Sequence, residues 1–73
     1  MIEVRLFATF RIGREKILFL EAEKYATAGE IIDVLEIPRE EVAILLINGR
    51  HSKADTAVHD GDVLALFPPV GGG

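Results

Sequence analysis

The sequence contains no cysteine, and this absence excludes several kinds of chemistry. Without a thiol the chain has no disulfide framework, no CxxC redox centre, no thiolate zinc ligand and no cysteine nucleophile. A small fold without disulfides must be held together by its hydrophobic core. We therefore expect one compact domain in a reducing compartment, the cytoplasm.

Positive charge and long apolar runs are also scarce. Eight lysines and arginines stand against twelve acidic residues, which gives a formal net charge of −4. Nucleic-acid-binding proteins depend on basic side chains to neutralise phosphates, so we expect no nucleic-acid partner. No apolar run approaches the roughly 18 residues of a membrane-spanning helix, and Glu3 and Arg5 interrupt the first apolar residues. The sequence predicts neither a membrane span nor a signal peptide.

Hydrophobic residues nevertheless make up 49% of the 73 positions, enough for a packed core. They alternate with polar residues from Ile2 to Phe10, which predicts a strand over this whole segment. A second apolar run, Ile17 to Leu20, follows a short stretch that contains Gly13. The short connection predicts that the two strands form an antiparallel hairpin.

A helix is expected from Ala28 to Glu36. Residues 27–30 read TAGE, which fits a capping box in which a threonine oxygen and a glutamate satisfy the first backbone N–H groups. Apolar residues then recur at helical spacing, and Pro38 ends the run because it disfavours helical geometry in the residue before it.

Three further strands are expected after the helix, at residues 42–47, at Arg50 and His51, and from Val63 to Phe67. Polar residues 52–59 are expected to be irregular and to close at a turn over residues 60–62. The element order predicts an α+β, β-grasp fold, with a mixed sheet of four or five strands covered on one face by one helix. We place the domain at residues 1–67 and a C-terminal tail at residues 68–73.

Alternation along the strands also predicts what the two faces of the sheet carry. If Val4, Leu6, Leu45, Ile47, Leu64 and Leu66 face the helix, then Phe7, Leu46 and Phe67 lie on the opposite face. An uncovered apolar patch of this kind commonly marks a protein interface. The alternative is that the tail or a loop covers some of these side chains.

Three segments resemble the MoaD/ThiS family of ubiquitin-like sulfur carriers. They are VRLFA at residues 4–8, ING at 47–49 and DGDVLALFPPVGGG at 60–73. The FPPV ending followed by glycines is most similar to MoaD, the small subunit of molybdopterin synthase. The chain departs from the pattern in its short first hairpin and in Gly71, which adds a third glycine to the usual diglycine.

The resemblance implies a role for the C-terminus. An E1-like enzyme of the MoeB or ThiF type would use ATP to adenylate the Gly73 carboxylate, and sulfur would then replace AMP to leave a thiocarboxylate. The tail would enter the active site of a partner such as a MoaE-type large subunit, and its residues are Pro68, Pro69, Val70, Gly71 and Gly72. The protein would be a sulfur-carrying co-substrate and not an enzyme, with no bound cofactor.

The physical properties of the tail agree with this role. Glycine has no Cβ, so a backbone of glycines can pass through a narrow channel. The seven residues from Phe67 to Gly73 reach roughly 20 Å when extended. Such a tail is long enough to enter a partner's active site while the domain stays outside.

Other functions remain open from the sequence. A ThiS-type carrier for thiamine biosynthesis and a ubiquitin-like modifier conjugated to lysines would use the same first step. An interaction module with an inert tail is a third possibility. His51 and His59 are expected to be solvated, and Asp60 and Asp62 to shape a turn, so no metal site and no catalytic group are predicted.

Overall fold

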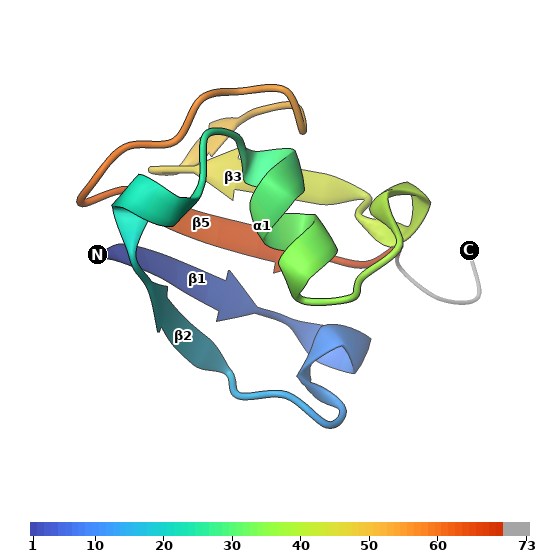
Figure 1. Ribbon diagram of the computed structural model, residues 1–73. Coiled ribbons are helices and arrows are strands. Elements are labelled where there is room, and N and C mark those ends of the chain that lie inside the picture. Colours follow the sequence, from blue (N-terminus) through green and yellow to red (C-terminus); the bar gives the residue numbers. More distant parts are fainter. Residues whose placement is uncertain (70–73) are drawn as a thin grey trace.

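The computed structural model describes residues 1–69, and a five-stranded mixed sheet is its central element. The sheet contains β1 (Ile2–Leu6), β2 (Ile17–Leu20), β3 (Ile44–Ile47), β4 (Arg50–His51) and β5 (Val63–Phe67), in the order β2-β1-β5-β3-β4. The central pair β1 and β5 is parallel, and every other neighbouring pair is antiparallel. The single α-helix, α1 (Ala28–Val34), crosses one face of this sheet (Figure 1). This arrangement confirms the β-grasp fold.

The hydrophobic core lies between α1 and the sheet. All six residues expected to face the helix are buried, and Val4, Leu6, Leu64 and Leu66 are 0% exposed. From the helix side the core receives Ala28, Ile31 and Ile32, with Ile2, Phe10, Ile37 and Val58 completing it. No charged or polar residue is buried among the described residues. Burial of apolar side chains is therefore the main stabilising term of the fold.

Helix α1 begins where the sequence predicts. The Thr27 hydroxyl accepts a hydrogen bond from the Glu30 N–H at 3.4 Å. The Glu30 carboxylate reaches back to the N–H of Ala26 at 3.0 Å, one residue earlier than in the usual capping box. The Thr27 contact satisfies a backbone donor that the helix itself leaves unpaired, and the Glu30 contact holds the residue just before the N-cap.

The helix ends at Val34, before the expected Glu36, because Glu36 adopts a left-handed conformation with φ of 60°. The Glu36 N–H donates to the Asp33 carbonyl and the Ile37 N–H donates to the Ile32 carbonyl, the two bonds of a Schellman motif. This turn brings Ile37 into the core, where it is 3% exposed.

The first strand is shorter than predicted. It ends at Leu6, because Ala8 has a φ of 54° and starts the 3₁₀ helix η1 (Ala8–Arg11). The alternating pattern predicted that Ala8 and Phe10 continue the strand, and this was wrong. Phe10 still reaches the core from η1 and is 6% exposed, so the same apolar residue is buried by a different local structure.

The third strand is also shorter than predicted, since residues before Ile44 do not join the sheet as strand. The 3₁₀ helices η2 (Ala22–Lys24) and η3 (Arg39–Glu41) were not predicted. By contrast β2, β4 and β5 have the predicted bounds. Within residues 1–69, no helix has the length and apolar character needed to cross a bilayer.

Two arginines fasten the loops to α1. The Arg14 guanidinium donates to the carbonyls of Leu35 at 3.1 Å and Glu36 at 3.3 Å, which satisfies acceptors at the end of the helix. The Arg39 guanidinium makes two hydrogen bonds to the Asp33 carboxylate, at 3.0 and 2.8 Å. These contacts tie the β1–β2 connection and η3 to the same helix.

Truncation of a core side chain tests the packing. Leu66→Ala should lower the free energy of unfolding by about 2–5 kcal/mol, because it removes a buried side chain and leaves a cavity. Ile12→Ala is the matched control, since Ile12 is 74% exposed and its loss should cost no more than about 0.5 kcal/mol. Urea unfolding followed by circular dichroism measures both values. Equal effects of the two substitutions would contradict the core described here.

Two carboxylates should give a small acid dependence of stability. Hydrogen bonds from Arg39 hold the pKa of Asp33 below its ordinary value of 3.8, and the N-terminal ammonium of Met1 does the same for the pKa of Asp60. When folding lowers the pKa of a carboxyl group, the ionised group stabilises the fold at pH values above its unfolded-state pKa. This contribution is lost as the pH falls through the folded-state pKa. Stability should therefore decrease below about pH 4.

The Asp33→Asn variant should show a shallower loss of stability over the same acidic range, measured as the urea midpoint at a series of pH values. Asp55→Asn serves as the control, because Asp55 makes no ion pair within residues 1–69. An unchanged slope in Asp33→Asn would show that the Arg39 ion pair does not contribute.

Candidate functional site

The sheet face opposite α1 carries a cluster of apolar side chains near the end of β5. Phe67 lies on this face, and its cross-strand neighbour on β3 is Ile44. Leu46 lies two residues along β3 on the same face, beside Ala65. The Phe7 ring stacks on the Phe67 ring, with centroids 4.2 Å apart and an angle of 10° between the planes. We call Phe7, Ile44, Leu46 and Phe67 the tail-side patch.

The structure thus brings together the three residues that alternation assigned to this face. Phe7, Leu46 and Phe67 are each partly exposed, and the stacked rings of Phe7 and Phe67 cover part of one another. Arg11 adds a positive charge at the edge of the patch, with its guanidinium carbon 5.3 Å from the Phe7 ring centroid. The role of these residues in partner binding stays a prediction.

Ile44, Ile17 and Phe19 also lie on this face and were missed in the sequence analysis. They are 37%, 47% and 61% exposed, respectively. The same period-two rule applied to residues 44–47 and 17–20 would have found them. Alternation assigned Leu45, Leu46 and Ile47 to the two faces in the sequence analysis but was not extended to Ile44, and it did not separate the faces of residues 17–20.

Charged side chains on β1 divide the open face into two apolar areas. Glu3 and Arg5 point to this face and form an ion pair with each other. Ile17 and Phe19 lie opposite them on β2, whereas the tail-side patch lies on the other side, over β3 and β5. The tail-side patch is the apolar area next to the root of the tail.

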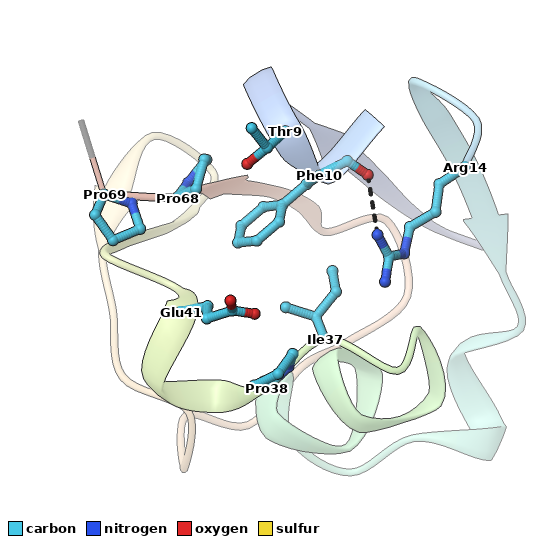
Figure 2. Close-up of a pocket in the computed structure, with 8 residues that line it drawn as sticks. All are labelled: Thr9, Phe10, Arg14, Ile37, Pro38, Glu41, Pro68 and Pro69. Atoms are coloured by element: carbon cyan, nitrogen blue, oxygen red, sulfur yellow. Dashed lines mark hydrogen bonds between the residues drawn. The ribbon is translucent and has the colours of Figure 1, made fainter. Parts of the chain in front are cut away.

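The tail leaves the sheet directly after Phe67. Pro68 and Pro69 cannot donate backbone hydrogen bonds, so sheet pairing stops at this point. They form one wall of a pocket of about 360 Å³, as Figure 2 shows. Val70, Gly71, Gly72 and Gly73, which the sequence analysis assigned to the tail, lie outside the described residues.

The pocket beside the tail has an apolar floor and polar groups at its rim. The Phe10 ring and the Ile37 side chain point into it, and the Glu41 carboxylate faces the same space (Figure 2). Its other lining residues are Thr9, Arg14 and Pro38. Because Arg14 is held by the carbonyls of the α1 terminus, the wall opposite the prolines is fixed in place.

The remaining polar candidates have structural contacts. The Asp62 carboxylate accepts hydrogen bonds from the Asn48 side chain at 2.9 Å and from the His59 N–H at 2.8 Å. Asn48 in turn accepts from the Val63 N–H, so this network joins the β3–β4 turn to the start of β5. Within residues 1–69, no three histidine, aspartate or glutamate side chains are grouped as metal ligands.

Comparison with known proteins agrees with this geometry. The model of the ThiS family matches residues 4–73. The small archaeal modifier protein 3 of Haloferax volcanii is 33% identical, over 99% of this chain and 98% of the relative. Solved structures are similar as well, among them two that are each 27% identical. SAMP1 from Haloferax volcanii has a TM-score of 0.74, with 99% of this chain and 98% of that chain covered.

The second structure is the complex of subunits 1 and 2 of molybdopterin-converting factor from Helicobacter pylori. It has a TM-score of 0.65, and the match covers 99% of this chain and 97% of the matched one. The similarity thus extends along the whole length of each protein, and the family model includes the tail-side patch. The MoaD/ThiS resemblance is confirmed, and the chain belongs to the ThiS family.

Proposed function

We propose that this protein carries sulfur as a thiocarboxylate on Gly73 and delivers it during the synthesis of molybdopterin. The family supports the coarser statement of a ubiquitin-like carrier or modifier. The observation that carries the role of a tail-delivering carrier is the position of the tail-side patch, which adjoins the point where the tail leaves β5. The choice of molybdopterin is supported by the similarity to subunit 1 of molybdopterin-converting factor. A partner that binds this patch is positioned to receive the tail.

The proposed chemistry takes place at the end of the backbone. In the first step a carboxylate oxygen of Gly73 attacks the α-phosphorus of ATP, and pyrophosphate leaves. Hydrosulfide, supplied through the activating enzyme, then attacks the carbonyl carbon of the acyl adenylate and displaces AMP, and loss of its proton leaves the thiocarboxylate. An acyl adenylate is a mixed anhydride, so its carbonyl carbon is open to attack by sulfur or by an amine.

The chain's own residues bind and orient the tail in this scheme. The patch supplies apolar contact area, and the stacked pair of Phe7 and Phe67 fixes the direction in which the chain leaves the sheet. Pro68 and Pro69 restrict the backbone to extended geometry, and glycines without Cβ leave room in a narrow channel. ATP is bound and used by the activating enzyme, which we propose to be of the E1-like type.

Sulfur delivery to a pterin would need a second partner. The Helicobacter pylori structure holds subunit 1 together with subunit 2 of molybdopterin-converting factor. By analogy we propose that a large subunit of the MoaE type binds the tail-side patch and receives the tail. A thiamine-directed carrier would use the same patch with a different acceptor enzyme.

Conjugation to proteins is the second candidate function. It is favoured by the 33% identity to a protein named as a small archaeal modifier. Here the amine of a target lysine would attack the activated Gly73 carbonyl and form an isopeptide bond. Both functions share the activation step and differ only in the acceptor.

An extension of the tail tests the activation step. One alanine added after Gly73 should abolish ATP–pyrophosphate exchange by the E1-like enzyme, because the group to be adenylated is moved away from Gly73. Circular dichroism should show an unchanged fold. Full exchange with the extra residue still present by mass spectrometry would contradict the mechanism and would favour an interaction module with an inert tail.

A charged residue in the patch tests the docking step. Leu46→Asp should weaken binding to the E1-like enzyme and to the large subunit by about tenfold or more, since burial of an unpaired carboxylate is costly. The free energy of unfolding should change by less than about 1 kcal/mol, because Leu46 is outside the core.

Ile12→Asp is the matched control for this substitution, as Ile12 is an exposed apolar residue in the loop before β2. It should leave both affinities unchanged in isothermal titration calorimetry. Equal binding by Leu46→Asp and the wild-type protein would remove the patch from the docking surface.

A further inference from the structure

The two edges of the sheet are unlike each other. At one edge β4 contains only the exposed residues Arg50 and His51, and such short, polar edge strands resist pairing with other chains. At the other edge lies β2, which is visible at the border of the sheet in Figure 1. All four residues of β2 are apolar, and the strand contains no proline, lysine or other charged residue. Within β2 itself, this edge therefore has no proline and no charged side chain to oppose pairing with another strand.

Within residues 1–69, the backbone of β2 has two residues whose N–H and C=O groups face away from the sheet without a partner. The Leu6 N–H donates to the Lys16 carbonyl at 2.8 Å, so these two residues form a hydrogen-bonded pair in the antiparallel β1–β2 ladder. Such pairs alternate along a ladder. Leu18 and Leu20 therefore turn their backbone groups toward β1, whereas those of Ile17 and Phe19 point away from the sheet.

The side chains of the same two residues are exposed. Ile17 and Phe19 are 47% and 61% exposed and lie on the open face of the sheet. The two positions with unpaired backbone groups are thus the two that carry exposed apolar side chains. A strand that pairs with β2 would satisfy both features together.

We propose that β2 pairs antiparallel with β2 of a second copy of this chain. A two-fold axis perpendicular to the sheet would place Leu18 opposite Leu18 of the other copy. Ile17 then lies opposite Phe19 of the other copy, twice by symmetry, and each such pair exchanges both of its backbone hydrogen bonds. The exposed isoleucine and phenylalanine side chains meet on one face as cross-strand pairs.

A second copy suits this edge because the strand is complementary to itself. In this register the residues with free N–H and C=O groups, Ile17 and Phe19, face each other. A shift by two residues would instead place Phe19 opposite Glu15, or Ile17 opposite Glu21, of the other copy. The pairing joins two five-stranded sheets into one and keeps both open faces on the same side. Both tail-side patches stay free, so the proposal does not depend on the chemistry of the tail.

The flanking charges keep this association weak. Next to the pair of Lys16 and Leu20 at each end, Glu15 of one copy falls opposite Glu21 of the other. These two like-charge pairs oppose pairing, and their repulsion is screened by salt. With so small an interface, we expect a dissociation constant on the order of 0.1 to 1 mM that decreases as salt is added.

Sedimentation equilibrium and NMR of the full chain test the proposal. We expect a monomer–dimer equilibrium in which amide-exchange protection of Ile17 and Phe19 rises with protein concentration. A chain that stays monomeric at about 1 mM would overturn the proposal. So would a dimer whose concentration-dependent shifts map to Ile44 and Leu46, since its copies would meet through the open face.

Three substitutions distinguish this register from nonspecific association of exposed apolar side chains. Glu15→Lys should tighten the dimer by about tenfold, because two like-charge pairs become opposite-charge pairs. Ile17→Thr should abolish it, whereas Ile12→Thr removes an exposed apolar side chain outside β2 and should leave it unchanged. A weaker dimer in Glu15→Lys, or equal losses in the two threonine variants, would contradict the pairing. Unfolding curves would show that each variant is folded.

Discussion

The parallel pairing of β1 with β5 is the interaction on which the rest of the structure depends. It joins the beginning of the chain to the last strand before the tail, from Glu3 beside Val63 to Leu6 beside Leu66. The Phe7 N–H extends the ladder by donating to the Leu66 carbonyl at 3.2 Å. Because these strands are central, their inward side chains form the most buried part of the core. At the end of the pair, Phe7 and Phe67 stack on each other on the open face.

This pairing also links the fold to the proposed function. The tail begins where the parallel pair ends, so any partner that recognises the stacked rings is next to the tail root. The wall of the neighbouring pocket is held by Arg14, which binds the carbonyls at the end of α1. The helix, the first hairpin and the tail root are therefore held in one arrangement, from which the tail extends.

Much of the fold could be predicted because its strands are short and strongly apolar. The bounds of β2 and β5 follow from their flanking residues, and Thr27 marks the start of α1. The ends of β1 and α1 could not be predicted, since Ala8 and Glu36, which follow them, adopt left-handed conformations without being glycine. Tertiary packing imposes both turns, because they bring Phe10 and Ile37 into the core.

The candidate site was predictable only in part, for a similar reason. Alternation placed Phe7, Leu46 and Phe67 on the open face, but the neighbours of each residue depend on strand register. Pairing of Ile44 with Phe67, and of Ile17 with Arg5, becomes known only from the sheet. The contact of Arg14 with the helix end spans 21 residues of sequence and has no local signal. The roles of the patch and of Gly73 remain predictions.

The most direct test of the sulfur-carrier account is the intact mass of the protein isolated from its native cells without a C-terminal tag. The account predicts a fraction of molecules in which one oxygen is replaced by sulfur, with the change located at Gly73 by fragmentation and reversed by hydrolysis. An unmodified mass in cells that are actively making molybdopterin would contradict it. If lysine-linked conjugates accompanied that unmodified mass, the protein would be a modifier instead.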